Sequence, residues 1–270
     1  RYMGRMLLGT GGEIGLHGYN HVPLCLEKDG INQANTYPAW QNQENGQAAM
    51  IELDQFGRSL FPSNPFSGYV PPSNILCPEA RDWLPKVLPN LKVISSLSFE
   101  EEDVGTYMQN FGEADDGIIE FPRIVSGYFL YEGEQLALIN ELGLHYVNSH
   151  FIHPDDILDP DRRENRTWAT MRSQLDDQYA WLRDNAPGLR NQTVSEGAMA
   201  VQRFSRVQVN AGLDGNQYII HLGGFYDQVF LMMRATRPPA NITGGTITRV
   251  TSSLYLIEAQ QPDLVVTFGD

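Results

Sequence analysis

Two patterns of hydrophobic and polar positions divide the chain at about residue 190. Up to that point short apolar runs alternate with longer stretches of helical periodicity. We expect strands at 13–16, 92–95, 117–121 and 144–148, and helices at 132–142 and 167–185. Alternating strands and helices are typical of an α/β layer or barrel. Residues 1–190 are therefore expected to form one α/β domain.

The remaining residues have the pattern of an all-β domain. Short apolar runs follow one another there, separated by turn sequences such as Asp214-Gly-Asn and without a helical stretch. We expect strands at 194–201, 204–209, 217–222, 228–234, 246–250, 253–258 and 264–268. Such a series is typical of two packed antiparallel sheets. The sequence therefore predicts a β-sandwich domain at 191–270.

His17 and His21 follow the first expected strand, in Glu13-Ile-Gly-Leu-His-Gly-Tyr-Asn-His21. Gly18 ends the strand, and two imidazoles four residues apart can then turn toward one point. Neutral imidazole nitrogens are common ligands of divalent metals. A core histidine beside a loop histidine would give the same spacing.

A second group of histidines lies around residue 150. His150 and His153 fall on opposite faces of a strand that Pro154 ends. In α/β barrels the catalytic groups come from the carboxyl ends of strands. We therefore expect His153 to carry chemistry, with His150 as the second choice. Asp155 and Asp156 would line the same site, or they would only cap and solvate a turn.

Two further stretches contain candidate residues. Pro72, Ser73 and Asn74 follow an apolar run, and Pro71-Pro72 would form a rigid corner in this loop. Arg123 follows the expected strand at 117–121. Its guanidinium could orient a carboxylate, contact sugar hydroxyls, or stand as an exposed cation.

These stretches together resemble the polysaccharide deacetylases. The resemblance rests on residues 12–24, 69–76, 117–126 and 145–161 and on 223–234 in the second domain. It is strongest for a divergent branch acting on hexosamine-rich exopolysaccharides, which includes the Pel deacetylases of bacterial biofilms and the fungal galactosaminogalactan deacetylase (carbohydrate esterase family 18). The resemblance implies a partial, deformed (β/α) barrel at 1–190, apparently without its amino-terminal part, and an accessory β-sandwich at 191–270.

The resemblance also implies a function, which is metal-dependent removal of N-acetyl groups from a polysaccharide rich in N-acetylhexosamine. One divalent ion, zinc by preference and cobalt or nickel as alternatives, would be held by His17 and His21. The implied roles of the other residues are catalysis by His153, with His150 second and Arg123 beside them, and substrate binding by Pro72, Ser73, Asn74, Asp155 and Asp156.

One part of the deacetylase pattern is missing. In that family a Thr-Phe-Asp-Asp-Gly-type motif precedes the histidine pair and provides the catalytic base and the third metal ligand, but no Asp precedes His17 here. We therefore expect either that the amino-terminal part of the barrel is absent from this chain or that activity has been lost. In the second case the chain would be a non-catalytic polysaccharide-binding module, with Phe225, Tyr226 or Tyr255 as stacking faces or as core. A peptide-cleaving metallohydrolase is disfavoured, because HExxH is absent.

Charge and cysteine content narrow the partners and the compartment. The net charge of −14 argues against nucleic acid and anionic membranes, and fits a neutral or cationic polymer. No apolar run approaches the ~20 residues of a membrane span. Cys25 and Cys77 could pair in an oxidising compartment, and three Asn-X-Thr sequons hint at secretion. The chain opens on Arg1, as a piece of a longer protein would. We expect an extracellular, secreted or cell-surface protein, or a periplasmic one.

Overall fold

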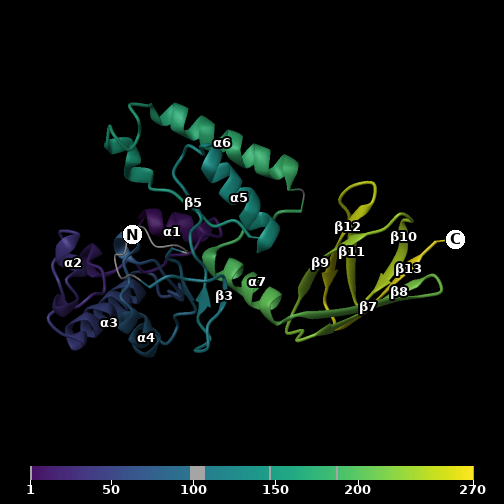
Figure 1. Cartoon of the computed structure of the whole chain (residues 1–270), viewed down its shortest axis with the longest axis horizontal. Helices are drawn as coiled ribbons and strands as arrows, with labels where there is room; N and C mark the ends of the chain where they lie inside the picture. The colour runs from purple at the N-terminus through teal and green to yellow at the C-terminus, as the bar shows by residue number, and fades with distance from the viewer. Residues whose placement is uncertain (1, 98–106, 146, 187, 270) are drawn as a thin grey trace. The chain divides into compact units, whose positions relative to one another are not determined.

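The structure is a computed structural model that describes residues 2–97, 107–145, 147–186 and 188–269 (Figure 1). Its internal contacts divide the chain into two compact units. The first comprises Arg1–Leu175 with Gln192–Val201, and the second comprises Asp176–Asn191 with Gln202–Asp270. Helices α6 (Trp168–Asn185) and α7 (Val194–Arg206) contribute residues to both units. The boundary predicted between residues 190 and 191 lies in the loop that joins these two helices.

The first unit combines helices with very short strands (Figure 1). Its helices are α1 (Tyr2–Gly9), α2 (Ile31–Ala34), α3 (Gln43–Leu60), α4 (Pro78–Val87) and α5 (Glu132–Leu144). Its strands are β1 (Gly68–Tyr69), β2 (Val93–Ile94), β3 (Gly112–Glu113), β4 (Ile119–Glu120), β5 (Val125–Ser126) and β6 (His150–Phe151). The 3-10 turns are η1 (Tyr19–His21), η2 (Glu27–Asp29), η3 (Pro72–Asn74) and η4 (Pro154–Leu158).

The central sheet of this unit is mostly parallel. Its strand order is β1-β2-β4-β3, with β1, β2 and β4 parallel and β3 antiparallel at the edge. A parallel bridge between Leu16 and Tyr69 extends the sheet, and β5 and β6 form a separate parallel pair. Parallel strands end at the same edge of a sheet, so the segments after Leu16, β1 and β4 leave together. Both sheets are open in the described residues, so closure into a barrel stays a prediction.

Helices α3 and α4 pack against the sheet through one apolar core. Met50 from α3 and Leu84 from α4 meet Tyr69 and Ile94 of the strands, and all four are fully buried or nearly so. Asn42 caps α3 by accepting a hydrogen bond from the Asn45 backbone N–H. A disulfide joins Cys25, in the loop after η1, to Cys77, the residue before α4. This side of the unit is therefore tied to the sheet by packing and by a covalent bond.

The second unit contains two antiparallel sheets that share one apolar core. One sheet has the order β10-β13-β8-β7 and the other β11-β12-β9. Side chains on alternate residues, such as Leu264 and Val266 of one sheet and Tyr255 and Ile257 of the other, fill the space between them. The strands are β7 (Gln208–Asp214), β8 (Gln217–Gly223), β9 (Val229–Arg234), β10 (Pro239–Thr243), β11 (Gly245–Arg249), β12 (Leu254–Ala259) and β13 (Asp263–Phe268).

The strands predicted at 194–201 and 204–209 are wrong, because most of this segment is helix α7. Thr193 and Glu196 begin the helix as a capping box, in which each side chain bonds the backbone N–H of the other residue. Ala198 and Val201 then pack against Phe121. Thr193-x-x-Glu196 is a sequence signal for a helix start, but the apolar residues that follow it also fit the alternation of a strand.

Other elements differ in position rather than in type. The strand predicted at 144–148 is wrong, since α5 runs through Leu144 and the strand β6 begins only at His150; residue 146 lies outside the described residues. The expected strand at 13–16 is reduced to the bridge at Leu16. The helices expected at 132–142 and 167–185 and the strands within 92–95 and 117–121 are confirmed.

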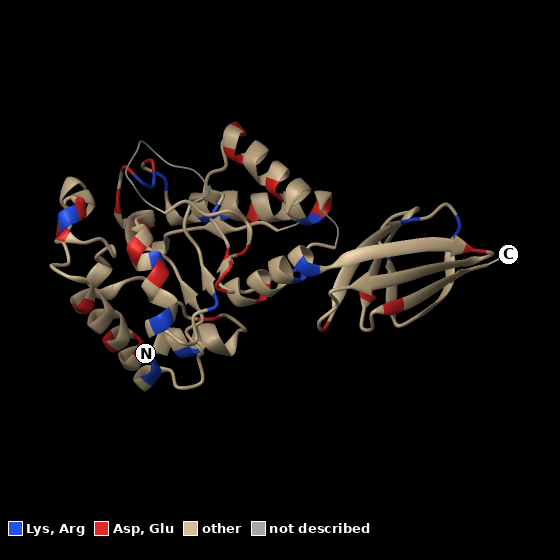
Figure 2. Cartoon of the chain, turned by 60° about the horizontal axis from the view of Figure 1, so that its bottom comes forward, with Lys and Arg blue, Asp and Glu red and all other residues tan. Residues whose placement is uncertain are grey.

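Acidic residues occur on several of the helices (Figure 2). The strands of the second unit carry few charges (Figure 2). Among the helices that the structure describes, none is both long and apolar enough to cross a membrane.

Candidate functional site

The backbone after Leu16 turns sharply and brings His17 and His21 together. Gly18 has φ of 78°, and Asn20 and His21 have φ of 50° and 58°, all in the left-handed region. A Cβ on Gly18 would lie 2.4 Å from Pro72 Cγ, so only glycine fits this turn. The two imidazole rings stand edge to face with their centroids 4.9 Å apart. The structure thus places the predicted pair side by side.

His17 is held in a defined orientation by the segment after β1. Its Nδ1 lies 2.8 Å from the Val70 carbonyl oxygen. Because a carbonyl only accepts, Nδ1 carries the proton and donates it, which leaves Nε2 with a free lone pair. Loss of surrounding water lowers the pKa of His17, and the charges of His21, Arg123 and His153 lower it further, while the Val70 carbonyl opposes the shift. The neutral ring is therefore the main form at neutral pH.

Tyr37 connects His21 to the loop after β1. The phenol oxygen lies 2.5 Å from Ser73 Oγ and 3.4 Å from His21 Nδ1. Ser73 and Asn74 also have positive φ, 49° and 62°, so η3 is strained where it approaches the histidines. Sequence reasoning missed Tyr37, and no local motif could have revealed it, because its partners lie far away along the chain.

Arg123 is buried next to these histidines. It retains 8% of its exposed surface, its Nε has no hydrogen-bond partner, and its guanidinium carbon lies 4.0 Å from the centre of the Phe151 ring. Burial lowers the pKa of Arg123 to about 10, so the group stays charged at neutral pH. Arg123 also lowers the pKa of both His17 and His153. Arg123 is therefore a buried cation, and the alternative of an exposed cation is wrong.

His153 packs edge to face against Phe151, at a centroid distance of 4.3 Å. Its Nδ1 is 4.0 Å from Asp156 Oδ1, and Asp156 in turn forms an ion pair with Arg162. Loss of water lowers the pKa of His153, Arg162 lowers it further, and Asp156 partly opposes the shift. Asp156 is buried at the start of η4. The ring therefore lies near a carboxylate without a hydrogen bond to it, and its neutral form prevails at neutral pH.

The other predicted residues occupy less central positions. His150 lies on the opposite face of β6 from Phe151, with its Nε2 2.7 Å from the Gly127 carbonyl oxygen. Asp155 is exposed and lies 3.8 Å from Arg162. Pro72 is buried against Gly18, and the Oδ1 atom of Asn74 is buried without a hydrogen-bond partner.

We refer to His17, His21, Arg123 and His153 as the histidine–arginine cluster. It contains two candidate metal ligands with free ring nitrogens and one buried cation. Within the described part of the chain, no group of three His, Cys, Asp or Glu side chains is arranged to hold a metal ion. The cluster therefore offers two nitrogen ligands, and a third, anionic ligand is not among the described residues.

A family of bacterial proteins matches almost the whole chain. Residues 2–256 match the family described as uncharacterised protein conserved in bacteria (DUF2194). The chain belongs to the DUF2194 family. Neither the curated proteins nor the solved structures contain a match to it. The function of this DUF2194 chain must therefore be argued from its own residues.

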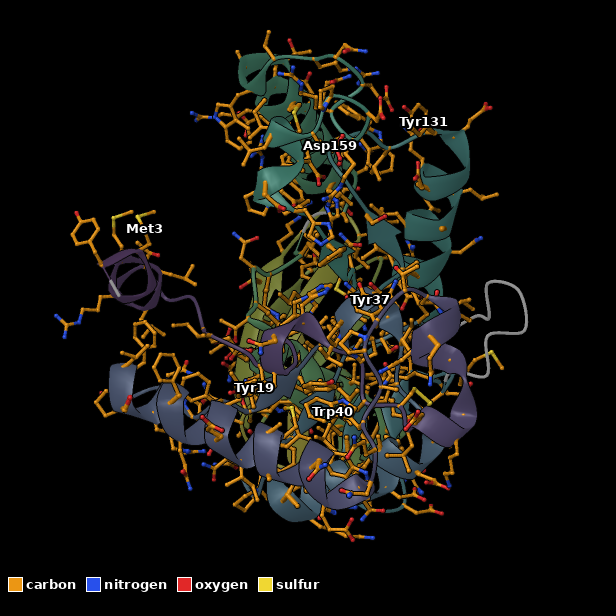
Figure 3. The ribbon with its side chains drawn as sticks, turned by 90° about the vertical axis from the view of Figure 1, so that its left-hand side faces the viewer. Met3, Tyr19, Tyr37, Trp40, Tyr131 and Asp159 are labelled. Carbon is orange, nitrogen blue, oxygen red and sulfur yellow. A yellow bond between two sulfur atoms is a disulfide. The ribbon has the colours of Figure 1, made fainter. Side chains whose placement is uncertain are left out.

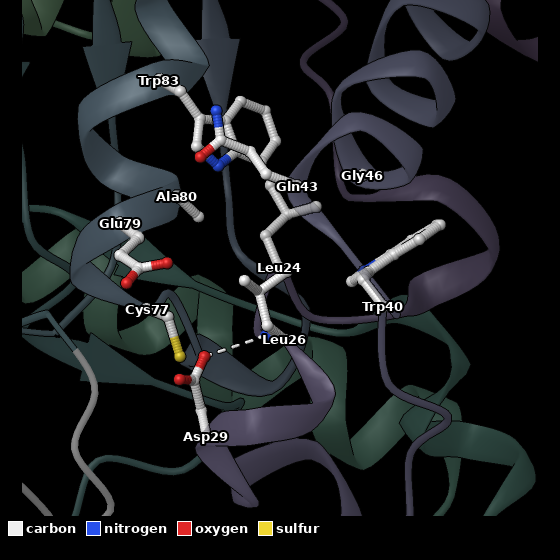
Figure 4. Close-up of a pocket in the computed structure, with 10 residues that line it drawn as sticks. All are labelled: Leu24, Leu26, Asp29, Trp40, Gln43, Gly46, Cys77, Glu79, Ala80 and Trp83. Carbon is white, nitrogen blue, oxygen red and sulfur yellow. Dashed lines mark hydrogen bonds between the residues drawn. The ribbon is translucent and has the colours of Figure 1, made fainter.

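The DUF2194 chain also has a small cavity between α3 and α4, near the disulfide (Figure 4). Leu24, Trp40, Cys77 and Trp83 are among the residues that line it, and its volume is about 10 Å³. This is about the space that one water molecule needs. The cavity is too small for a substrate, so it does not compete with the histidine–arginine cluster as a candidate site.

The two lowered histidine pKa values predict a dependence of stability on pH. The unfolded chain, with histidine pKa values near ~6.5, binds protons more readily than folded His17 and His153. The free energy of unfolding should therefore fall as the pH drops below about 6.5 and level off below the folded values. Urea unfolding between pH 5 and 8 should show a weaker dependence in a His17→Gln/His153→Gln variant. Equal slopes in the two proteins would contradict the prediction.

Proposed function

We propose that this chain carries the metal-binding and proton-donating part of a deacetylase that hydrolyses the N-acetyl groups of a hexosamine-containing exopolysaccharide. One observation carries the proposal. His17, His21, Arg123 and His153 come from segments far apart in the sequence, follow Leu16, β4 and β6, and act on one another electrostatically. Gathering of catalytic groups beyond strand ends is typical of α/β enzymes. A partial (β/α) barrel is the fold that we propose with this function.

The histidine pair fits a divalent metal in its ligand chemistry. The Val70 carbonyl fixes the tautomer of His17, as partners of metal-binding histidines usually do, and Tyr37 faces Nδ1 of His21. His17 and His21 would thus hold the ion through Nε2, and zinc, cobalt or nickel would accept two imidazoles. When bound, the ion supplies Lewis-acid activation of water and of the acetyl carbonyl. The third ligand would be a carboxylate from outside the described residues.

The other members of the cluster would act on the substrate. His153 would donate a proton to the nitrogen of the departing amine from its protonated form, which the lowered pKa makes the minor form at neutral pH and also the stronger acid. The carboxylate of Asp156 lies near this ring. Arg123, which has no anionic partner among the described residues, would orient a carboxylate or bind sugar hydroxyls. Ser73, Asn74 and Asp155 would border the bound polymer.

The compartment of this reaction would be extracellular, at the cell surface, or periplasmic. The Cys25–Cys77 disulfide supports an oxidising environment, because such bonds persist mainly outside the cytosol. A net charge of −14 is compatible with a polymer that becomes cationic as its acetyl groups are removed.

A non-catalytic role in polysaccharide binding is the second candidate. The observation in its favour is the incomplete ligand set, since the described residues offer two imidazoles and no third metal ligand beside them. In this case the histidine–arginine cluster would bind sugar without hydrolysis.

Acetate release and metal binding by the full-length natural protein would distinguish the two functions. We expect zinc-dependent release of acetate from N-acetylhexosamine oligomers, reduced at least about 100-fold in His17→Ala/His21→Ala, because removing metal ligands removes the activated water. Calorimetric titration with Zn²⁺ should show one site that the same variant lacks. His221→Ala, in the second unit, is the matched control and should behave like the unmodified protein. Zinc binding or oligomer binding without acetate release would reject the deacetylase and leave the binding module.

A further inference from the structure

An open groove lies on α3 beside the turn that carries the histidine pair. Tyr19, Trp40, Gln41, Asn45 and Glu52 line it, together with three alanines. Its volume is about 470 Å³, within the usual range of small-molecule sites. Tyr19 belongs to the same 3-10 turn as His21 and precedes it by two residues. The groove therefore begins next to the histidine–arginine cluster.

The floor of the groove follows from the sequence of α3. Asn45, Ala48, Ala49 and Glu52 are spaced by three, one and three residues, so they form one stripe along the helix. The small alanines leave room between the two polar side chains. This stripe gives the groove a flat apolar base with one hydrogen-bonding group near each end.

The walls are aromatic and at least one of them is fixed. The Trp40 indole N–H donates a hydrogen bond to the Pro23 carbonyl oxygen at 3.0 Å, and the Trp40 backbone pairs with Leu26. Tyr19 and Trp40 lie on the same side of α3 in Figure 3. Both side chains are only partly buried. Two partly exposed aromatic rings thus lie along the groove. The indole of Trp40 is held by Pro23, which does not line the groove, so the other polar groups of the lining stay available to a ligand.

The lining matches a pyranose better than a peptide or a lipid. Aromatic faces pack against the C–H faces of sugar rings, while amide and carboxylate groups bond hydroxyls. No strand edge lines the groove, so it has no ladder for an extended peptide. Glu52 is the single charged residue in the lining, and it forms no ion pair with a described residue. An ammonium group of a ligand would form an ion pair with the Glu52 carboxylate, and the aromatic rings would also attract such a cation.

We propose that the groove formed by Tyr19, Trp40, Asn45 and Glu52 is a binding subsite for a hexosamine unit with a free amine, adjacent to the unit at the histidine–arginine cluster. The part of this proposal that concerns adjacency rests on the proposed function. It predicts a preference for polymer that is already partly deacetylated, so that each free amine favours binding of the chain next to it.

Binding of two hexosamine tetramers tests the proposal, one fully N-acetylated and one with a single free amine. Calorimetry at low salt should give about threefold to fivefold tighter binding of the second, which is the expected worth of one exposed charge pair, and salt should reduce the difference. Glu52→Gln should abolish the preference, whereas Glu44→Gln, on the same helix but outside the groove, should keep it. Tyr19→Ala should weaken binding of both tetramers by about tenfold.

The binding assay also separates the subsite from the proposed hydrolysis. Binding should persist in His17→Ala/His21→Ala, which leaves the groove intact. Tetramer binding that depends on Tyr19 and Glu52 in a protein that releases no acetate would uphold the subsite and reject the deacetylase. The subsite would be overturned if both tetramers bind equally. It would also be overturned if Glu52→Gln still releases acetate faster from the tetramer with a free amine than from the fully N-acetylated one. A variant that fails to fold is recognised by its circular dichroism, and Trp40→Phe, which keeps an aromatic wall, then replaces Tyr19→Ala as the probe.

Discussion

Reduction of the Cys25–Cys77 disulfide should lower the free energy of unfolding by about 4 kcal/mol, the loop-closure value for a bond of this span. The two cysteines are 52 residues apart in the sequence, and both are buried. The bond adds a covalent link to a segment that also contacts the unit through the bridge between Leu24 and Leu76, through the Lys28–Glu79 ion pair and through the apolar core around Leu24. Without it, the unfolded chain gains many conformations while the native contacts stay the same.

Urea unfolding with and without reductant measures this effect. We expect the midpoint to fall clearly in reductant, and a Cys25→Ala/Cys77→Ala variant to show no further response to reductant. Circular dichroism of the second unit's strands provides an internal comparison, because the bond lies wholly in the first unit. An unfolding curve that reductant leaves unchanged would mean that the loop is ordered by packing alone.

Replacing Arg123 with methionine should stabilise the fold by roughly 1–3 kcal/mol. The guanidinium is buried, its Nε has no hydrogen-bond partner, and no described carboxylate pairs with it. The cost of burying an unpaired cation exceeds what its contact with the Phe151 ring returns. Methionine keeps the length and the apolar contact, so removal of the charge is the main change. Thermal and urea unfolding of Arg123→Met would measure the gain.

Arg81 offers the matched comparison, because it is equally buried but paired. Its guanidinium bonds both Asp116 oxygens at 2.7 and 3.0 Å and lies 3.8 Å from Glu120. Arg81→Met should therefore destabilise the fold by about 3–5 kcal/mol, because it leaves Glu120 buried without its cation. Opposite signs at the two arginines would identify Arg123 as a residue retained for function at the expense of stability. Destabilisation in both variants would show that Arg123 is a structural residue.

The sequence predicted those parts of the site that depend on local order. The expected strand at 13–16, ended by Gly18, was enough to predict that His17 and His21 converge, and they do. Tyr37 could not be predicted, because its position is determined by contacts with Ser73 and His21 that only the folded chain creates. The burial of Arg123 depends in the same way on Phe151, a residue of another strand.

The errors in secondary structure have a related cause. The sequence predicts two strands in place of helix α7, because the apolar residues of the helix also satisfy an alternating pattern over short distances. The capping signal at Thr193 is the local feature that favours the helix. Strand β10 was not among the predicted strands; it begins at Pro239, and proline is tolerated at the first position of an edge strand. Tertiary pairing, not local preference, decides both segments.

The tight turn at Gly18 has a consequence for sequence searches. Two histidines four residues apart also converge on a helix, but in this chain the rings converge through a tight turn, and the second position of that turn must be glycine to pass Pro72. Among DUF2194 sequences, a glycine there and a proline in the facing loop should therefore vary together. A search for that pair of letters would find functional relatives more selectively than a search for the histidines.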